Sequence, residues 1–244
     1  MRLLGLDFET TGLDTNKDHI TEMGLAIWDV PMKRPLVTLG MFFWNENYAP
    51  LTDEIIKLTG LTDGILQEFG TCPKKNLEWL EGFVSKHKID YVVAHNGENF
   101  DKPFLYSCLT RLGVEAPTLR GLPWIDTRTD IPFPSEPDSR RLRHLALDCG
   151  FINPFEHRAV FDVLTMMKVL SHYDIQQVLA YQKIPFKTVR AMVGYEDRQL
   201  AKEQRYSWEK LGDKTYPKCW VKRIKEDKLE AERKACKFPV VVIE

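Results

Sequence analysis

The stretch LLGLDFETTG, at residues Leu3–Gly12, begins with an expected apolar β-strand over Leu3–Phe8 and has two acidic residues near the end of that strand. Asp7 and Glu9 are separated by one residue, and side chains alternate between the two faces of a strand, so both carboxylates lie on one face. Two buried anions this close repel each other unless a cation compensates them, which favours a divalent metal ion. The alternative is that this face of the strand ends at solvent, where an acidic pair needs no metal.

Two further apolar stretches follow this strand, at His19–Val30 and Leu36–Trp44, and turn residues separate the three. Three adjacent strands at this point indicate an antiparallel meander. The pattern then alternates, and we expect helices at Asp53–Thr59, Asn76–His87, Lys102–Gly113, Leu142–Cys149 and Ala159–His172, with strands at Ile89–Ala94 and Trp124–Asp126. This order predicts an α/β domain over residues 1–180, in which a mixed sheet, antiparallel in its first three strands and then parallel, is flanked by helices.

Charge is distributed unevenly along the chain. The formal net charge of the 244 residues is -1, but residues 181–244 contain 16 Lys or Arg and 10 Asp or Glu, a net charge of +6. The first 180 residues therefore carry -7, so an acidic body precedes a basic tail. We predict a domain boundary near residue 180 and a small basic C-terminal module over residues 181–244.

Aromatic residues lie among the basic residues of this module. The segments Tyr206–Trp208 and Cys219–Arg223 predict a hairpin, with Tyr216 between them. One interpretation is that the aromatic face forms the module's own small core. The other is a nucleic-acid surface, where aromatic rings stack on bases and basic groups meet phosphates. The candidate residues for this second interpretation are Trp208, Trp220, Lys222 and Arg223. The alternating charges of Lys225–Lys237 indicate an exposed helix.

Three segments carry a resemblance to a known family. In order, DFETTG at Asp7–Gly12, AHNGENFDKPFL at Ala94–Leu105 and HRAVFD at His157–Asp162 resemble the three exonuclease motifs of the DnaQ-like 3′→5′ exonucleases. The resemblance covers residues 1–170 and implies an RNase H-like fold. His157 stands five residues before Asp162, as in the His-containing subclass known as DEDDh. The Tyr-containing subclass would have Tyr where this chain has Arg158.

The resemblance implies a metal-dependent site. The four carboxylates Asp7, Glu9, Asp101 and Asp162 are the hard oxygen ligands that Mg²⁺ or Mn²⁺ prefers. In the family, two divalent ions flank the scissile phosphate, one activating the attacking water and the other stabilising the leaving 3′ oxygen. By motif position, Asp7 should bridge both ions, Glu9 and Asp162 should hold the ion on the nucleophile side, and Asp101 should act mainly through bound water.

His157 is the candidate general base, because neutral imidazole is well suited near pH 7 to accept a proton from metal-bound water. Five residues at 100° each would place His157 and Asp162 about 140° apart in one regular helix. Both can face one metal site only if His157 lies before the regular helix or in an irregular first turn. Pro154 is consistent with such an entry to the helix.

Several other residues are candidates for substrate contact. Thr10 and Thr11 resemble the stretch that contacts the terminal nucleotide in relatives, although a turn after the first strand needs no substrate. The second motif supplies His95, Asn96 and Phe100, where a structural role at a strand end is the alternative. Arg140, Arg141 and Arg143 could meet the nucleic-acid backbone or belong to a solvated loop. Glu98 is an extra carboxylate that the motif does not require.

We therefore expect a 3′→5′ exonuclease that releases nucleoside 5′-monophosphates from the 3′ end of DNA, with single-stranded or frayed ends preferred. The alternative within enzymes is a 3′→5′ exoribonuclease of RNase T or oligoribonuclease type, because nothing in the sequence reads the 2′-hydroxyl. A catalytically silent nucleic-acid-binding module is a third hypothesis. The presence of all five motif residues (Asp7, Glu9, Asp101, His157 and Asp162) argues against it.

The cellular context is bounded by what the chain lacks. Its five cysteines are odd in number and widely spaced, with no CxxC pair, so neither a disulfide framework nor a zinc ribbon is indicated. The sequence contains no apolar run of the roughly 18–20 residues that a membrane helix needs. We expect a soluble, unprocessed protein in a reducing cytoplasm of bacterial or phage-host type. A replication or repair protein is a candidate partner, but no polymerase motif is present.

Overall fold

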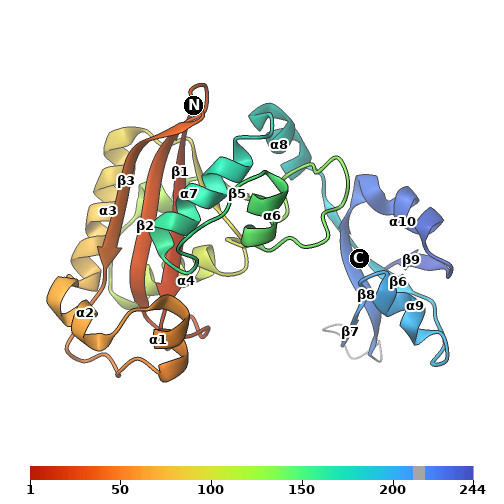
Figure 1. Cartoon of the computed structure of the whole chain (residues 1–244), viewed down its shortest axis with the longest axis horizontal. Helices are drawn as coiled ribbons and strands as arrows, with labels where there is room; N and C mark the ends of the chain where they lie inside the picture. The colour runs from red at the N-terminus through yellow and green to blue at the C-terminus, as the bar shows by residue number, and fades with distance from the viewer. Residues whose placement is uncertain (211–217, 244) are drawn as a thin grey trace. The chain divides into compact units, whose positions relative to one another are not determined.

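The computed structural model describes residues 1–210 and 218–243. The chain forms two compact units, Met1–Tyr181 and Gln182–Glu244, each of which is described by itself (Figure 1).

A five-stranded mixed sheet is the centre of the first unit. Its strands are β1 (Arg2–Thr10), β2 (Ile20–Asp29), β3 (Arg34–Phe42), β4 (Tyr91–Ala94) and β5 (Trp124–Asp126), in the spatial order β3-β2-β1-β4-β5. The first three pair antiparallel, whereas β4 pairs in parallel with β1, and β5 pairs in parallel with β4. The predicted mixed sheet, antiparallel first and then parallel, is confirmed.

Helices pack on both faces of this sheet (Figure 1). They are α1 (Asp53–Thr59), α2 (Asp63–Phe69), α3 (Pro73–His87), α4 (Asp101–Arg111), α5 (Pro117–Gly121), α6 (Leu142–Asp148), α7 (Ala159–Leu170) and α8 (Ile175–Gln182). One core layer joins Leu4, Leu6 and Phe8 of β1 to α3 and α4. The other joins the opposite face of β1 and β2 to α6 and α7. Alternate residues of β1 therefore face different helix layers.

Glycines allow α7 to lie unusually close to the sheet. A β-carbon at Gly24 in β2 would overlap the backbone of Ala159, the first residue of α7. A β-carbon at Gly5 in β1 would lie 2.8 Å from Cγ1 of Val163. The start of α7 therefore packs closely against β1 and β2, which brings the third motif close to the first.

Three helices of this unit, α2, α5 and α8, were not predicted from the sequence. Helix α2 is only seven residues long; Thr62 caps its start by accepting a hydrogen bond from the amide of Ile65 at 3.3 Å. Helix α8 lies at Ile175–Gln182, where the sequence analysis placed only a boundary. All three are too short for helical periodicity to distinguish them clearly from loops.

The second unit is a four-stranded antiparallel sheet with two helices. Its strands β6 (Phe186–Ala191), β7 (Ser207–Glu209), β8 (Cys219–Lys225) and β9 (Val240–Val242) lie in the order β7-β8-β6-β9. Helices α9 (Arg198–Glu203) and α10 (Leu229–Ala235) accompany them, with a 3-10 turn at Glu226–Lys228. Strands β7 and β8 form the predicted hairpin, in which Trp208 is directly opposite Trp220. Tyr216 lies outside the described residues.

Among residues 1–210 and 218–243, no helix has both the length and the apolar character needed to cross a membrane. All five cysteines are free thiols.

Candidate active site

The site begins with the carboxylates of β1. Leu6 and Phe8 belong to the core layer under α3 and α4, so Asp7 and Glu9 point toward the face on which α7 packs. Glu9 is buried, with 9% of its surface exposed. The observed strand register places Asp7 and Glu9 on one face of β1, as expected from the sequence.

Asp101 brings the second motif to the first. It is the first residue of α4 and is 1% exposed. Its Oδ1 atom accepts a hydrogen bond from the backbone amide of Phe8 at 3.2 Å, directly between Asp7 and Glu9 in sequence. The amide fixes the Asp101 carboxyl group beside β1.

Asp162 brings the third motif to the same place. It lies in the first turn of α7, where its Oδ2 accepts a hydrogen bond from the backbone amide of His157 at 2.9 Å. Its Oδ1 accepts a second hydrogen bond, at 2.7 Å, from the side-chain amide of Asn153. The Oδ1 of Asn153 in turn accepts a bond from the amide of Phe155 at 3.0 Å. The loop before α7 is therefore tied to the Asp162 carboxylate at two points.

His157 lies before α7 and outside the regular helix, which is the condition that the 100° spacing imposes. Its backbone φ is 61°, in the left-handed region that non-glycine residues rarely adopt. Glu9, His157 and Asp162 each offer one ligand atom, and these three atoms lie within 4.8 Å of one another. An exposed imidazole thus faces two carboxylates across a space suited to a cation or a water.

The carboxylates strongly perturb one another. Burial, followed by the charges of Asp101 and Glu9, raises the pKa of Asp7 well above its ordinary value. Burial and then the charge of Asp162 raise the pKa of Glu9 to about 8. Burial likewise raises the pKa of Asp101 to about 7 and that of Asp162 to about 6. Metal-free, Glu9 would hold a proton at pH 7 and Asp101 would be partly protonated, whereas Asp162 would be mostly ionised.

This donor set fits a divalent metal ion. Four crowded carboxylates with raised pKa values have an excess of negative charge that a hard cation would offset. Arg158 lowers the pKa of Glu9, but burial and the neighbouring acids outweigh it. Asp7, Glu9, Asp101 and Asp162 are the residues that could hold Mg²⁺ or Mn²⁺.

Sequence reasoning missed a second charged pair at this site. Glu22 in β2 is directly opposite Glu9 in the β1–β2 ladder and is 2% exposed. Arg158, next to His157, donates from Nε to Glu22 Oε2 at 3.0 Å and from Nη2 to Oε1 at 3.3 Å. An acidic residue inside the apolar run of β2 was the available signal.

The other motif residues lie near the site but are engaged within the protein. Thr10 donates its hydroxyl to the carbonyl of Gly12 at 2.6 Å, and Thr11 donates to Asp18 at 3.1 Å. Asn96 adopts a positive φ of 69°. Phe100 packs against Phe104 in the core, with ring centroids 5.5 Å apart.

His95 makes two hydrogen bonds inside the protein. Its Nδ1 pairs with Thr127 Oγ1 at 2.9 Å and its Nε2 with the carbonyl of Arg140 at 3.0 Å. Burial lowers the pKa of His95 to about 4, so the ring is neutral at pH 7. Neither ring nitrogen can meet a substrate without giving up one of these partners. The geometry favours the structural alternative for this residue.

The arginine-rich segment is only partly available to a ligand. The Arg140 guanidinium pairs with both oxygens of Glu136, at 2.8 and 2.9 Å, and donates to the carbonyl of Arg128 at 2.6 Å. Arg141 and Arg143 are exposed at the start of α6. The unexpected Glu98 is paired with Lys102 at 2.9 Å, which offsets its charge on the approach to the site.

In the second unit the predicted contact residues divide into two groups. Lys222 donates to both oxygens of Glu232 in α10, at 2.9 and 2.8 Å, and Trp220 packs against the small core. Trp208 is 52% exposed and contacts Trp220 with ring centroids 5.3 Å apart. Arg223 is exposed and lies over the ring of Phe186 at 4.5 Å.

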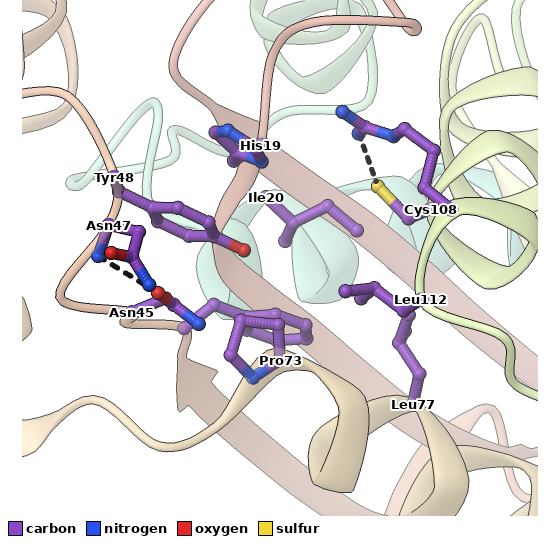
Figure 2. Close-up of a pocket in the computed structure, with 11 residues that line it drawn as sticks. His19, Ile20, Asn45, Asn47, Tyr48, Pro73, Leu77, Cys108 and Leu112 are labelled. Atoms are coloured by element: carbon purple, nitrogen blue, oxygen red, sulfur yellow. Dashed lines mark hydrogen bonds between the residues drawn. The ribbon is translucent and has the colours of Figure 1, made fainter.

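A separate cavity of about 350 Å³ lies on the α3–α4 side of the sheet (Figure 2). His19 and Tyr48 stack at its rim with ring centroids 3.9 Å apart, above an apolar floor that includes Ile20 and Leu77. The cavity shares no lining residue with the carboxylate site.

The sheet and the carboxylate site can now be compared with those of known proteins. A mixed sheet whose first strand ends in paired carboxylates, completed by acidic residues from two helices, is typical of nucleases with an RNase H-like fold. The RNase T family model, described as Exonuclease, matches residues 4–170. The chain belongs to this exonuclease family, and the prediction of a DnaQ-like 3′→5′ exonuclease is confirmed.

Two sequence relatives illustrate the range of the family. The DNA polymerase III PolC-type protein of Mycoplasma pneumoniae is 29% identical over 180 residues, which cover 70% of this chain and 11% of the polymerase. The human Three-prime repair exonuclease 1 is 26% identical over 223 residues, which cover 79% of this chain and 70% of that enzyme. The chain thus spans about a tenth of the polymerase.

Solved structures establish the same fold. The nuclease domain of 3′hExo, a DEDDh family member bound to rAMP, has a TM-score of 0.59 and 16% identity, covering 70% of this chain and 90% of that domain. Escherichia coli exonuclease I in complex with a dT13 oligonucleotide has a TM-score of 0.63 and 14% identity, covering 92% of this chain and 63% of that protein.

Proposed function

We propose that this exonuclease hydrolyses phosphodiester bonds from the 3′ end of DNA, prefers single-stranded or frayed ends and releases nucleoside 5′-monophosphates. The observation that carries the proposal is the convergence of Asp7, Glu9, Asp101 and Asp162, with His157 beside two of them. This arrangement supplies both metal ligands and a proton acceptor at one point on the surface.

The four carboxylates are proposed to hold two divalent ions, Mg²⁺ or Mn²⁺. When bound, such ions supply a Lewis acid at the phosphate, an activated water and charge stabilisation of the leaving oxygen. By motif position, Asp7 is the ligand proposed to serve both ions, while Glu9 and Asp162 serve the nucleophile side. Asp101 is held by the Phe8 amide, which suits a role through bound water.

His157 is proposed to accept the proton of the attacking water. Its imidazole is exposed and faces Glu9 and Asp162. The backbone amide of His157 donates a hydrogen bond to Asp162, which holds the residue at the site. Imidazole also suits this task because its ordinary pKa lies near neutral pH. Thr10, Thr11, Asn96 and Phe100 are proposed to line the path of the terminal nucleotide.

DNA is favoured as substrate by the relatives that bind it or copy it. The human relative is named a three-prime repair exonuclease, the mycoplasma relative is a DNA polymerase, and exonuclease I is solved with dT13. An exoribonuclease is the second candidate, because a 3′-exonuclease of this fold is solved with a histone mRNA stem-loop. A replication or repair assembly is the proposed setting.

The second unit is proposed to increase affinity for nucleic acid. Its sequence carries +6 against the -7 of residues 1–180, and a polyanion approaching four carboxylates needs compensating charge. Arg223 and Trp208 are the exposed candidates; Lys222 and Trp220 contribute mainly to packing within the unit.

The decisive experiment compares products from matched, 5′-end-labelled single-stranded DNA and RNA. With Mg²⁺, a ladder that shortens from the 3′ end of DNA and stops in EDTA supports the proposal. Faster degradation of the RNA strand would support the exoribonuclease instead. No degradation of either strand by the wild-type protein, in Mg²⁺ and in Mn²⁺, would contradict both.

A further inference from the structure

The pair formed by Glu22 and Arg158 lies at the edge of the carboxylate site. The guanidinium of Arg158 contacts both oxygens of Glu22, at 3.0 and 3.3 Å, and lies over the ring of Phe42 at 5.6 Å. Glu22 is 2% exposed, whereas the side chain of Arg158 is 37% exposed. The two-point contact restricts the guanidinium plane more than a single bond would.

Glutamate is a residue type that binds metal ions, but both carboxylate oxygens of Glu22 are already engaged by Arg158. It is directly opposite Glu9 in the β1–β2 ladder, close enough that its charge raises the pKa values of both Glu9 and Asp7. Both of its oxygens accept hydrogen bonds from Arg158. The negative charge of Glu22 is therefore matched by a cation of the chain itself.

Arg158 joins this pair to His157. It is the residue after His157 and the last before α7. His157 has a φ of 61°, a conformation that its own side chain does not favour and that surrounding contacts must maintain. One such contact is its amide bond to Asp162 Oδ2 at 2.9 Å, and the other is the attachment of the next residue to β2. β2 pairs with strands on both sides, so it is a rigid support.

We propose that Glu22 and Arg158 are positioning residues, which hold the backbone of residues 157–158 against β2 so that the imidazole of His157 faces Glu9 and Asp162. Glu22 is not itself a metal ligand. The proposal rests on the proposed function only in taking His157 as the proton acceptor. It goes beyond that function in naming what maintains the backbone conformation of His157.

Steady-state kinetics on single-stranded DNA test the pair. Arg158→Gln removes the charge and the two-point contact, and we expect kcat to fall about 10- to 100-fold, the usual effect of removing a group that orients an active-site residue. KM and the Mn²⁺ concentration for half-maximal rate should stay within about twofold. Arg158→Lys, which keeps a cation near Glu22, should recover part of the loss. Arg34→Gln, at the exposed start of β3, is the matched control.

Glu22→Gln and the double variant show whether Glu22 and Arg158 act together or independently. If the two act only together, Glu22→Gln/Arg158→Gln should be no slower than Arg158→Gln alone. If Glu22→Gln raised the Mn²⁺ concentration for half-maximal rate tenfold or more, Glu22 would instead be identified as a metal ligand. A tenfold rise in KM with unchanged kcat for Arg158→Gln would identify Arg158 as a phosphate contact. Either result overturns the proposal.

A metal-free measurement makes the test independent of activity. The His157 amide proton, which donates to a carboxylate, should have a distinct NMR shift in the wild-type protein, lose it in Arg158→Gln and keep it in Arg158→Lys. An unchanged shift in Arg158→Gln would overturn the positioning role even if the rate fell. If the wild-type protein degrades neither DNA nor RNA, the proposed function fails first, while the NMR comparison still decides whether the pair holds the backbone.

Discussion

The backbone amide of Phe8 donates a hydrogen bond to Oδ1 of Asp101, 93 residues later in the chain, at 3.2 Å. Because the side chain of Phe8 is buried in the core, this amide cannot move without disturbing β1. The donor is a backbone group of β1, so only a substitution at the acceptor, Asp101, would remove this link between the first and second motifs.

Replacing Asp7 or Asp162 by Asn should abolish metal-dependent activity while the protein still folds. Each change removes a charge that offsets the cation, and the raised pKa values mean that repulsion between carboxylates also decreases. The melting temperature of metal-free Asp7→Asn should therefore equal or exceed that of wild type, whereas Asp162→Asn loses one of the two hydrogen bonds that the carboxylate accepts and should melt slightly lower. Glu54→Gln, in the exposed first turn of α1, is the control. Full activity of Asp7→Asn on single-stranded DNA would exclude the two-metal mechanism.

His157→Ala should lower turnover by roughly 10²–10⁴-fold, the usual range for losing a general base. Mn²⁺ binding measured by calorimetry should stay near normal. If binding is lost instead, His157 is a metal ligand, which its distance from Glu9 and Asp162 also permits.

Metal binding should release protons at neutral pH. Burial holds the pKa of Glu9 at about 8 and that of Asp101 at about 7, so both are substantially protonated at pH 6.5 and must ionise to coordinate a cation. Mn²⁺ affinity should therefore rise steeply between pH 6 and pH 8. Calorimetry in two buffers of different ionisation enthalpy measures the release. Affinity independent of pH over this window would contradict the raised pKa values.

The raised pKa values also predict how the stability of the metal-free protein depends on pH. A carboxyl group with a raised folded-state pKa binds more protons when folded, so its stabilising contribution is present below its ordinary pKa of about 4 and is lost as pH rises toward the folded value of about 8. The apparent melting temperature should fall from pH 5.5 to pH 8 without metal. Saturating Mg²⁺ should flatten or reverse this trend.

His95→Ala should reduce stability more than catalysis. The change removes two internal hydrogen bonds and leaves the Arg140 carbonyl without the His95 donor, at a cost of about 1–3 kcal/mol, whereas the Thr127 hydroxyl keeps its bond to the Ala94 carbonyl. The depressed pKa means that His95 is neutral when folded, so its contribution is present above pH 6.5 and is lost as pH falls toward 4. Urea unfolding of wild type and variant measures both effects. A tenfold rise in KM with unchanged stability would restore His95 as a substrate contact.

Truncation after Gln182 should leave turnover at saturating substrate little changed, since the carboxylates lie within Met1–Tyr181. Affinity for long single-stranded DNA should fall and depend less on salt, because Lys and Arg residues of the second unit are removed. Oligonucleotides that reach only the active site should bind as before. An unchanged salt slope on long strands would indicate a protein partner for the second unit instead.

Within the second unit, Trp220→Ala should lower the melting temperature because Trp220 packs against the core. Trp208→Ala should affect stability less, since Trp208 is 52% exposed, and its effect on DNA affinity tests base stacking. Loss of affinity with an unaltered melting temperature in Trp220→Ala would contradict the packing role.

The sequence predicted those parts of the site that depend on local geometry. The two-residue period of a strand was enough to place Asp7 and Glu9 on one face, and the 100° step of a helix was enough to require His157 before α7. Both arguments use only residues close in sequence. The change from adjacent strands to alternating strands and helices predicted a mixed sheet, but the spatial order of its strands was not predicted.

The parts that were missed depend on contacts between distant segments. Glu22 is opposite Glu9 only because of the β1–β2 register, and Arg158 reaches it across 136 positions. Asn153 was overlooked because a loop asparagine has many roles, and only its 2.7 Å bond to Asp162 identifies this one. The two partners of His95 come from segments 32 and 45 residues away.

The left-handed backbone of His157 has a consequence for protein engineering. A residue held at a φ of 61° costs about 1–3 kcal/mol that glycine would largely avoid. We therefore expect His157→Gly to be more thermostable than His157→Ala, and both to lose most of the wild-type turnover. A search for stabilising substitutions guided by melting temperature alone would select glycine here and remove the activity. At this position, stability and catalysis favour different amino acids.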